Sequence, residues 1–217
     1  MVDGRRPGER AGLNRERVLD VALDLVDHSG TGALTMRRLG AELGVEAMTL
    51  YHHVPGKQAL LDGLVERVLT QALPLDTTEE DWRPLLRAYA HGLRSALLRH
   101  PGVLPLVAAR PAVTPAALDT VERCLRVLTG AGIELGRALH TVNSLALLAI
   151  SHATAEAAGL GEEGPGSAEW LAGADPGRYP LLTEAARTGA GVDDAERFEL
   201  AVEALLAGVS RPAAPRR

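Results

Sequence analysis

Apolar residues recur along most of this chain at intervals of three and four positions, the spacing that places side chains on one face of an α-helix. Such stripes predict helices over residues 14–29 and 57–73, with two shorter helices between Thr35 and Val54. No segment shows the alternation of apolar and polar residues that marks a half-buried strand. The pattern therefore predicts an all-α protein.

The helical stripes lengthen after a short acidic segment at residues 76–81. They predict helices over residues 82–100, 115–130, 135–158 and 192–209, and a short helical piece within 101–111. The helix over 135–158 is apolar nearly all round, so we expect it to be buried on most sides. Residues 159–178 contain six glycines and two prolines, which favours a flexible loop.

Residues 34–61 are the most informative segment, because two short helices follow each other across a tight turn. The Thr35 hydroxyl is placed to cap the first helix, and Gly44 suits a left-handed exit from it. Leu50 points inward from the second helix, which leaves residues 47–49 on the outside. A short, outward-facing helix braced by the helix before it is typical of a helix-turn-helix, which predicts DNA binding.

This motif divides the chain into parts. We expect a DNA-binding domain at residues 13–73, whose last helix links it to a larger helical domain at 74–210. Residues 1–12 are expected to form a flexible arm and residues 211–217 a disordered tail.

The distribution of charge limits how such a protein could bind DNA. The chain carries a net charge of −5, and residues 1–57 contain eight basic and eight acidic side chains. Binding must therefore depend on a few placed contacts and not on a generally basic surface.

The single cysteine, Cys124, excludes an intramolecular disulfide and favours a reducing, cytoplasmic setting. The first residues lack the apolar core of a signal peptide, and the longest apolar run is too short to span a bilayer. We therefore expect a soluble, cytoplasmic protein with no membrane partner.

The segment L-T-M-R-R-L-G-A-E-L-G-V-x-x-x-T-L-Y-x-H-V at residues 34–54, followed by G-K-Q-A-L-L-D at 56–62, resembles the DNA-binding domain of the tetracycline-repressor family. Trp82 at the start of a long helix and the pair Arg110-Pro111 extend the resemblance more loosely over most of the chain. The resemblance implies an all-helical homodimer whose N-terminal domains read a palindromic double-stranded DNA operator. It also implies that the larger domains dimerise and hold a small-molecule inducer.

By motif position, the resemblance implies that Arg37 and residues 47–49 face bases, and that Tyr51, His53 and Lys57 bind phosphates. Lys57 begins its helix, where backbone amides already favour an anion. The alternative is that Tyr51 and the histidines are solvated surface residues. The full set of predicted DNA-binding residues is Thr35, Arg37, Ala47, Met48, Thr49, Tyr51, His52, His53 and Lys57.

Polar residues on otherwise apolar helices mark a candidate pocket in the larger domain. Their spread over three long helices and one connector suggests a shared cavity between helices. For each of them, the alternative is a hydrogen-bonded core or interface residue. With their apolar neighbours, the predicted ligand-binding residues are Tyr89, Leu93, Leu106, Arg110, Cys124, Asn143, Ser144, Leu147 and His152.

The sequence departs from the family where magnesium would bind. Members that bind tetracycline hold it through a magnesium ion with a histidine ligand, yet residues 104–110 contain no histidine, and Leu73 stands where a pocket histidine would be expected. We therefore predict no cofactor and no metal. An uncharged or weakly acidic, largely apolar inducer fits better, with Arg110 and Asn143 available for a carboxylate or carbonyl group.

Catalysis is not predicted, because the chain contains no G-x-S-x-G, H-E-x-x-H or C-x-x-C motif. The sequence instead predicts a ligand-responsive transcriptional repressor with no catalytic residues. Two alternatives stay open. One is a small-molecule sensor or carrier with weak DNA affinity, since Ala47 and Met48 offer few hydrogen bonds. The other is an activator.

Overall fold

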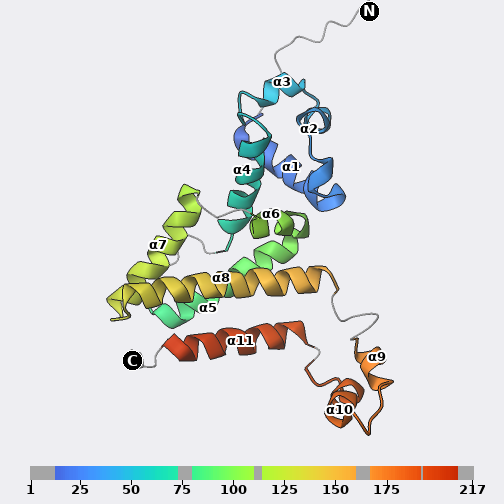
Figure 1. Cartoon of the computed structure of the whole chain (residues 1–217). Helices are drawn as coiled ribbons and strands as arrows, with labels where there is room; N and C mark the ends of the chain where they lie inside the picture. Colours follow the sequence, from blue (N-terminus) through green and yellow to red (C-terminus); the bar gives the residue numbers. More distant parts are fainter. Residues whose placement is uncertain (1–12, 73–79, 110–113, 160–166, 192, 210–217) are drawn as a thin grey trace, which may run out of the picture.

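The computed structural model describes residues 13–72, 80–109, 114–159, 167–191 and 193–209, and within these ranges it contains helices and no strand (Figure 1). The prediction of an all-α chain is confirmed. The elements are α1 (Arg15–Ser29), η1 (Thr31–Ala33), α2 (Met36–Glu42), α3 (Ala47–Leu50), α4 (Lys57–Leu69), α5 (Trp82–Arg99), η2 (Pro101–Val103), α6 (Leu104–Ala109), α7 (Pro115–Gly130), α8 (Leu135–Ala157), α9 (Ala168–Ala172), α10 (Pro180–Thr188) and α11 (Asp194–Val209).

Side-chain caps explain where several helices begin. Asn14 accepts a hydrogen bond from the backbone amide of Arg17 at 2.8 Å, which satisfies a free amide in the first turn of α1. Thr114 caps α7 in the same way, and Pro115 supplies a backbone angle that suits the first helical position. The helix starts predicted at these positions are confirmed.

Helices α1 to α4 form an upright N-terminal unit, drawn in blue to teal in Figure 1. Helix α1 packs against α2 and α4, and α2 packs against α3. The core of this unit consists of fully buried aliphatic side chains: Val18, Ala22, Val26, Leu34, Leu39, Leu50, Leu60 and Leu64.

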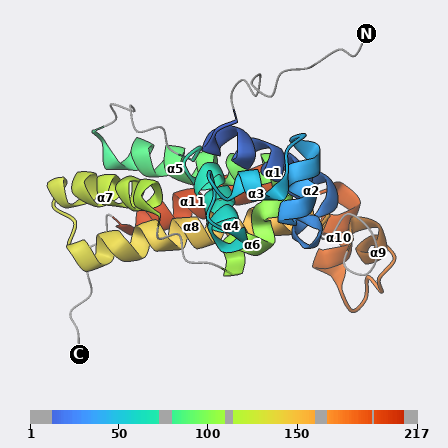
Figure 2. The ribbon, with the colours of Figure 1, turned by 90° about the horizontal axis from the view of Figure 1, so that it is seen from above.

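The remaining helices form a larger body below this unit. Helices α5 and α8 pack along each other, α7 covers one part of the pair, and α11 lies along α8 on the other side (Figure 1). Phe198 of α11 is fully buried, and the ring of His91 on α5 meets it edge-on with centroids 5.2 Å apart. Ion pairs of α11 with α5, such as Arg87 with Glu203, add to this contact. Seen from above, α4 stands over the middle of the layer (Figure 2).

Two expectations differ from the structure. Residues 168–172 and 180–188 form α9 and α10, which pack on each other and project from one end of the body (Figures 1 and 2). The predicted loop at 159–178 therefore contains a helix. The Ser167 hydroxyl caps α9. The loop prediction rested on the glycine content of the segment and did not take this capping residue into account.

Helix α8 is also less buried than its composition predicts. Leu135, Leu139 and Leu147 are exposed along it in the single chain. An all-round apolar helix indicates that every face meets a partner, but does not say whether that partner belongs to the same chain.

The domain boundaries remain predictions. The predicted arm and tail, Leu73 and Arg110 lie outside the described residues. None of the described helices is both long and apolar enough to cross a membrane.

Candidate functional site: a DNA-reading tip and an apolar cavity

The turn between α2 and α3 is held by local geometry. Thr35 accepts a hydrogen bond from the amide of Arg38 at 3.1 Å, and Gly44 adopts a φ of 65°. Gly40 is buried against the turn and the start of α3, because a Cβ there would lie 2.8 Å from the carbonyl oxygen of Val45 and 3.2 Å from the amide nitrogen of Ala47. Only glycine lets α2 and α3 approach so closely. The cap and the left-handed turn are confirmed, whereas the need for Gly40 was not foreseen.

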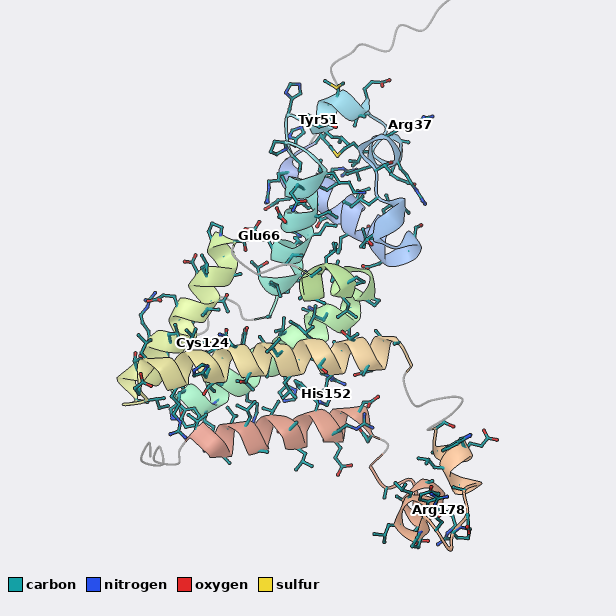
Figure 3. All side chains as sticks on the ribbon, in the orientation of Figure 1. Arg37, Tyr51, Glu66, Cys124, His152 and Arg178 are labelled. Atoms are coloured by element: carbon teal, nitrogen blue, oxygen red, sulfur yellow. The ribbon has the colours of Figure 1, made fainter. Side chains whose placement is uncertain are left out.

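The predicted DNA-binding residues gather at the end of the molecule remote from α11, where Figure 3 labels Arg37 and Tyr51. The Met48 side chain is 73% exposed and that of Tyr51 is 45% exposed. Arg37, His52 and Lys57 are exposed as well, while Ala47, Thr49 and His53 are half-buried. The Thr35 hydroxyl serves as the α2 cap, which leaves its other lone pair for further contacts.

Below this unit, a cavity of about 390 Å³ lies between the end of α4 and helices α5 to α8. Its volume is that of a small-molecule site. The described residues of its wall are almost all apolar: Leu69, Ala72, Tyr89, Leu93, Val107, Ala108, Ala109, Ala117, Thr120, Val121, Ala146, Leu147 and Ile150.

The structure brings only some of the predicted ligand-binding residues to this cavity. Tyr89, Leu93 and Leu147 line it. Leu106 and Cys124 are buried nearby but are not part of the wall. Burial raises the pKa of the Cys124 thiol to about 11, which keeps it protonated and unreactive.

Three of the predicted residues, all on α8, are not part of the described cavity wall. Asn143 and Ser144 are exposed to solvent, about one helical turn before the stretch that meets the cavity. His152 points the other way, toward α11 (Figure 3), where its ring meets Phe198 edge-on with centroids 5.2 Å apart. Five residues along a helix correspond to a rotation of about 140° from Leu147, so these two side chains could not share one site. The sequence contains no signal that selects between these faces.

The cavity is in contact with the DNA-binding unit through α4. Leu69 ends that helix and Ala72 follows it, and both belong to the cavity wall. Ala72 also packs against α5, where Gly92 lies so close to its backbone that a Cβ on Gly92 would be 1.8 Å from the Ala72 carbonyl oxygen. The end of α4 is therefore part of the cavity wall and is closely packed against α5.

A second contact joins the two parts through α1. The Asp27 carboxylate binds Nδ1 of His100 at 2.8 Å and accepts a hydrogen bond from the amide of Gly102 at 3.1 Å. A Cβ on Gly102 would lie 2.5 Å from the carbonyl oxygen of Val26, so this contact is close-packed. The η2 turn held here runs directly into α6, whose last residues line the cavity.

A magnesium ion does not fit the described wall of the cavity. Magnesium is held by carboxylate oxygens in octahedral geometry. The polar side chains that the structure places on the wall are the hydroxyls of Tyr89 and Thr120. No cluster of three or more histidine, cysteine or acidic side chains occurs among the described residues.

Comparison with known proteins is consistent with this arrangement. Residues 18–64 match the family described as "Bacterial regulatory proteins, tetR family", and residues 73–212 match "Tetracyclin repressor-like, C-terminal domain". The chain belongs to the tetracycline-repressor (TetR) family. The Escherichia coli tetracycline repressor protein class D is 36% identical over 202 residues, covering 91% of this chain and 89% of that protein. The repressor DrrR1 of Streptomyces coeruleorubidus is 31% identical over 228 residues, covering 99% of this chain and 84% of that protein.

Solved structures of the TetR family share the fold. Apo ActR from Streptomyces coelicolor superposes with a TM-score of 0.77 at 26% identity, covering 92% of this chain and 95% of that chain. ActR in complex with actinorhodin gives a TM-score of 0.75 at 26% identity, covering 92% and 97% of the two chains. The N-terminal helix-turn-helix domain and the larger helical domain are thus those of a TetR-family transcriptional regulator.

The prediction from sequence does not include the alanines of the cavity wall. Ala108, Ala109, Ala117 and Ala146 leave the space, and an alanine on a helix stripe looks the same whether it packs in a core or borders a void. Thr120 was also missed, because a threonine within a helix commonly bonds to its own backbone, as it does here.

Proposed function

We propose that this protein is a ligand-responsive transcriptional repressor that leaves a palindromic operator when a small, largely apolar inducer enters the cavity. The observation that carries the proposal is the shared position of α4, which is both the last helix of the DNA-binding unit and part of the cavity wall. A ligand that binds better to a wider or narrower cavity favours the matching position of α4. Operator affinity then changes by the same coupling free energy.

Reading a palindrome requires two copies. Each chain leaves apolar side chains exposed on two adjacent helices, namely Leu135 and Leu139 on α8 and Leu200 on α11. We propose that two chains pair through these helices in the cytoplasm, and that the pair holds its α3 helices about 34 Å apart, one turn of DNA. The complex of ActR with actinorhodin supports a cavity that accepts a small molecule.

At the DNA, we propose that Arg37 and residues 47–49 contact bases and that Tyr51, His53 and Lys57 contact phosphates. Met48 and Ala47 suit the methyl groups of thymine, whereas Arg37 suits a guanine through two parallel hydrogen bonds. Thr35 and His52 are expected to add contacts to the sugar-phosphate backbone.

The test is selection of DNA duplexes from a randomised pool, followed by fluorescence anisotropy with the enriched sequence. Recovery of a two-fold symmetric sequence bound at nanomolar dimer is expected. Arg37→Ala should reduce discrimination at one base pair by about 1–3 kcal/mol. Lys57→Ala should weaken all sequences alike and lower the salt slope by about one.

Arg178→Ala is the matched control for Arg37→Ala, because Arg178 lies beside Tyr179 at the α9–α10 end, remote from the reading tip (Figure 3). It should leave DNA binding unchanged. If no duplex is enriched, the protein is not an operator-binding repressor, and a sensor with weak DNA affinity becomes the better description. Position of the operator relative to the promoter separates a repressor from an activator.

A further inference from the structure

The cavity wall contains one side-chain proton donor that no described residue uses. The Tyr89 side chain is only 7% exposed and lines the cavity from α5. Among the described residues, none is hydrogen-bonded to its hydroxyl. Because Tyr89 lines the cavity, its hydroxyl can bond to whatever fills that space. A ligand that displaces water from such a group without offering an acceptor loses the free energy of that hydrogen bond.

The other hydroxyl on the described wall is already committed. Thr120 donates its proton to the carbonyl oxygen of Ala116 at 3.1 Å, one turn back along α7. Its oxygen can still accept a hydrogen bond but cannot donate one. Tyr89 is thus the one described wall side chain that can offer a proton to a ligand.

Burial, together with the nearby Cys124, raises the pKa of Tyr89 well above its ordinary value, so the hydroxyl stays protonated across the physiological range. A neutral donor in an apolar cavity favours a neutral acceptor. An ionised ligand would lose its hydration without gaining a charged partner from the described wall.

We propose that this cavity takes neutral, largely apolar molecules that carry a carbonyl-type acceptor oxygen, and that the Tyr89 hydroxyl selects them by hydrogen-bonding to that oxygen. This inference rests on the proposed function only in assigning the cavity as the inducer site. It narrows the ligand class to uncharged ketones, quinones, esters or amides with a mostly apolar skeleton.

Two tricyclic probes of nearly identical shape, 9-fluorenone and fluorene, test the proposal, because they differ by one carbonyl oxygen. Their affinities for the full-length protein are measured by calorimetric titration without DNA. Tyr89→Phe removes only the hydroxyl. We expect it to lower the ratio of fluorenone affinity to fluorene affinity by about two- to tenfold, the value of one neutral hydrogen bond, and to leave the fluorene affinity unchanged.

Tyr179→Phe, which removes the same atom from a remote, partly exposed tyrosine, should leave both affinities as in the wild type. 9-Fluorenone-4-carboxylate should bind at least about a hundredfold more weakly than fluorenone, because its charge must be desolvated.

Any of the following results would overturn the proposal: no change in the fluorenone-to-fluorene ratio in Tyr89→Phe, no uptake of either neutral probe by the wild type, or binding of the carboxylate as tight as that of fluorenone. A loss of fluorene affinity equal to that of fluorenone would also overturn it, since Tyr89 would then act only by packing. None of these outcomes bears on operator binding, which is measured separately on the selected DNA.

Discussion

The DNA-reading end and the cavity end of this protein are filled in different ways. In α1 to α4, large aliphatic side chains such as Leu39, Leu50 and Leu64 are completely buried against one another. In the body, helices α5 to α8 meet around a space of about 390 Å³, left open by small residues such as Ala117 and Ala146. Both ends consist mainly of aliphatic residues, so the difference lies in the size of the side chains where the helices meet.

This difference suits the two tasks. A filled core holds its surface residues in one arrangement, because closely packed side chains do not move independently. The exposed residues around α3 therefore keep a fixed spacing for DNA. An open cavity can admit ligand atoms without repacking, and the surrounding helices can shift by small amounts. Rigid reading and adjustable sensing are thus separated along α4.

Removal of a large side chain should cost most in the filled core. Leu50→Ala leaves a hole among fully buried neighbours, so we expect the free energy of unfolding to fall by about 2–5 kcal/mol. Leu93→Ala only enlarges an existing cavity, on a side where Leu93 already lacks contacts, so the loss should be about 2 kcal/mol or less. Urea unfolding at one fixed protein concentration measures both. A larger loss for Leu93→Ala would remove the distinction between the two interiors.

Enlarging a buried side chain should also destabilise the filled core more than the cavity wall. Ala22 is fully buried in α1, so Ala22→Leu is expected to destabilise the protein by about 1–3 kcal/mol through overpacking. Ala146→Leu extends into the cavity and should change the unfolding free energy by less than about 0.5 kcal/mol. It should also weaken fluorenone uptake, because it takes up the space. If both variants are equally destabilised, the cavity is not free space in solution.

The extent of prediction from sequence also differs between the two ends. At the DNA-reading end, Thr35, Gly44 and Lys57 each have a local role that the neighbouring residues determine, so their places could be read from the chain. At the cavity, the helix stripes predicted which segments are helical and that Tyr89 and Leu93 face inward. They could not predict which helix faces meet, because that depends on contacts between segments far apart in the chain.

Asn143 and His152 illustrate this limit. Both are polar residues on an apolar helix, which marks them as unusual without indicating a direction. Asn143 lies beyond the end of the cavity, and His152 packs on Phe198 of α11. The helices α9 and α10 were missed for a related reason, since they contact each other and little of the body, and their stripes are short.

Asp27 of α1 forms the junction that connects the DNA-reading end to the body. We expect its loss to lower the free energy of unfolding by less than the loss of a large core side chain does. Asp27→Ala removes both the bond to His100 and the bond from the Gly102 amide. Both partners are part-buried, so we expect a loss of about 1.5 kcal/mol in the free energy of unfolding, the value of a hydrogen bond to a charged group. Asp24→Ala, an exposed carboxylate one turn earlier on α1, is the control and should cost a few tenths at most.

The same junction should also affect signalling. Weakening it frees α1 from the turn that leads into α6, so the change in operator affinity on saturation with fluorenone should shrink in Asp27→Ala. Anisotropy titrations with and without the probe measure that change. If the coupling stays at the wild-type value while stability falls, the junction is structural only, and α4 alone connects the cavity to the DNA.

The smallest expected effect is a pH dependence of the unfolding free energy that arises from His152 in the body. Burial lowers the pKa of His152 below its usual value near 6.5, and the charges of Arg197 and Arg94 act in the same direction. Asp194 and Glu156 act against it. The folded state therefore favours the neutral imidazole. The stability that this gives is fully present above the unfolded value of about 6.5 and is lost as the pH falls through it, because the unfolded chain then binds the extra proton.

His152→Gln removes this titration and keeps a side chain that can form hydrogen bonds. The difference in unfolding free energy between wild type and variant should therefore decline as the pH is lowered from 7.5 to 5, while contributions from the other histidines cancel in the difference. Fluorenone affinity should stay unchanged, because His152 faces α11 and not the cavity. If the difference in unfolding free energy does not vary with pH, His152 is not the source of any acid sensitivity of the protein. A change in probe affinity would mean that the two faces of α8 are not independent, and that α11 takes part in ligand sensing.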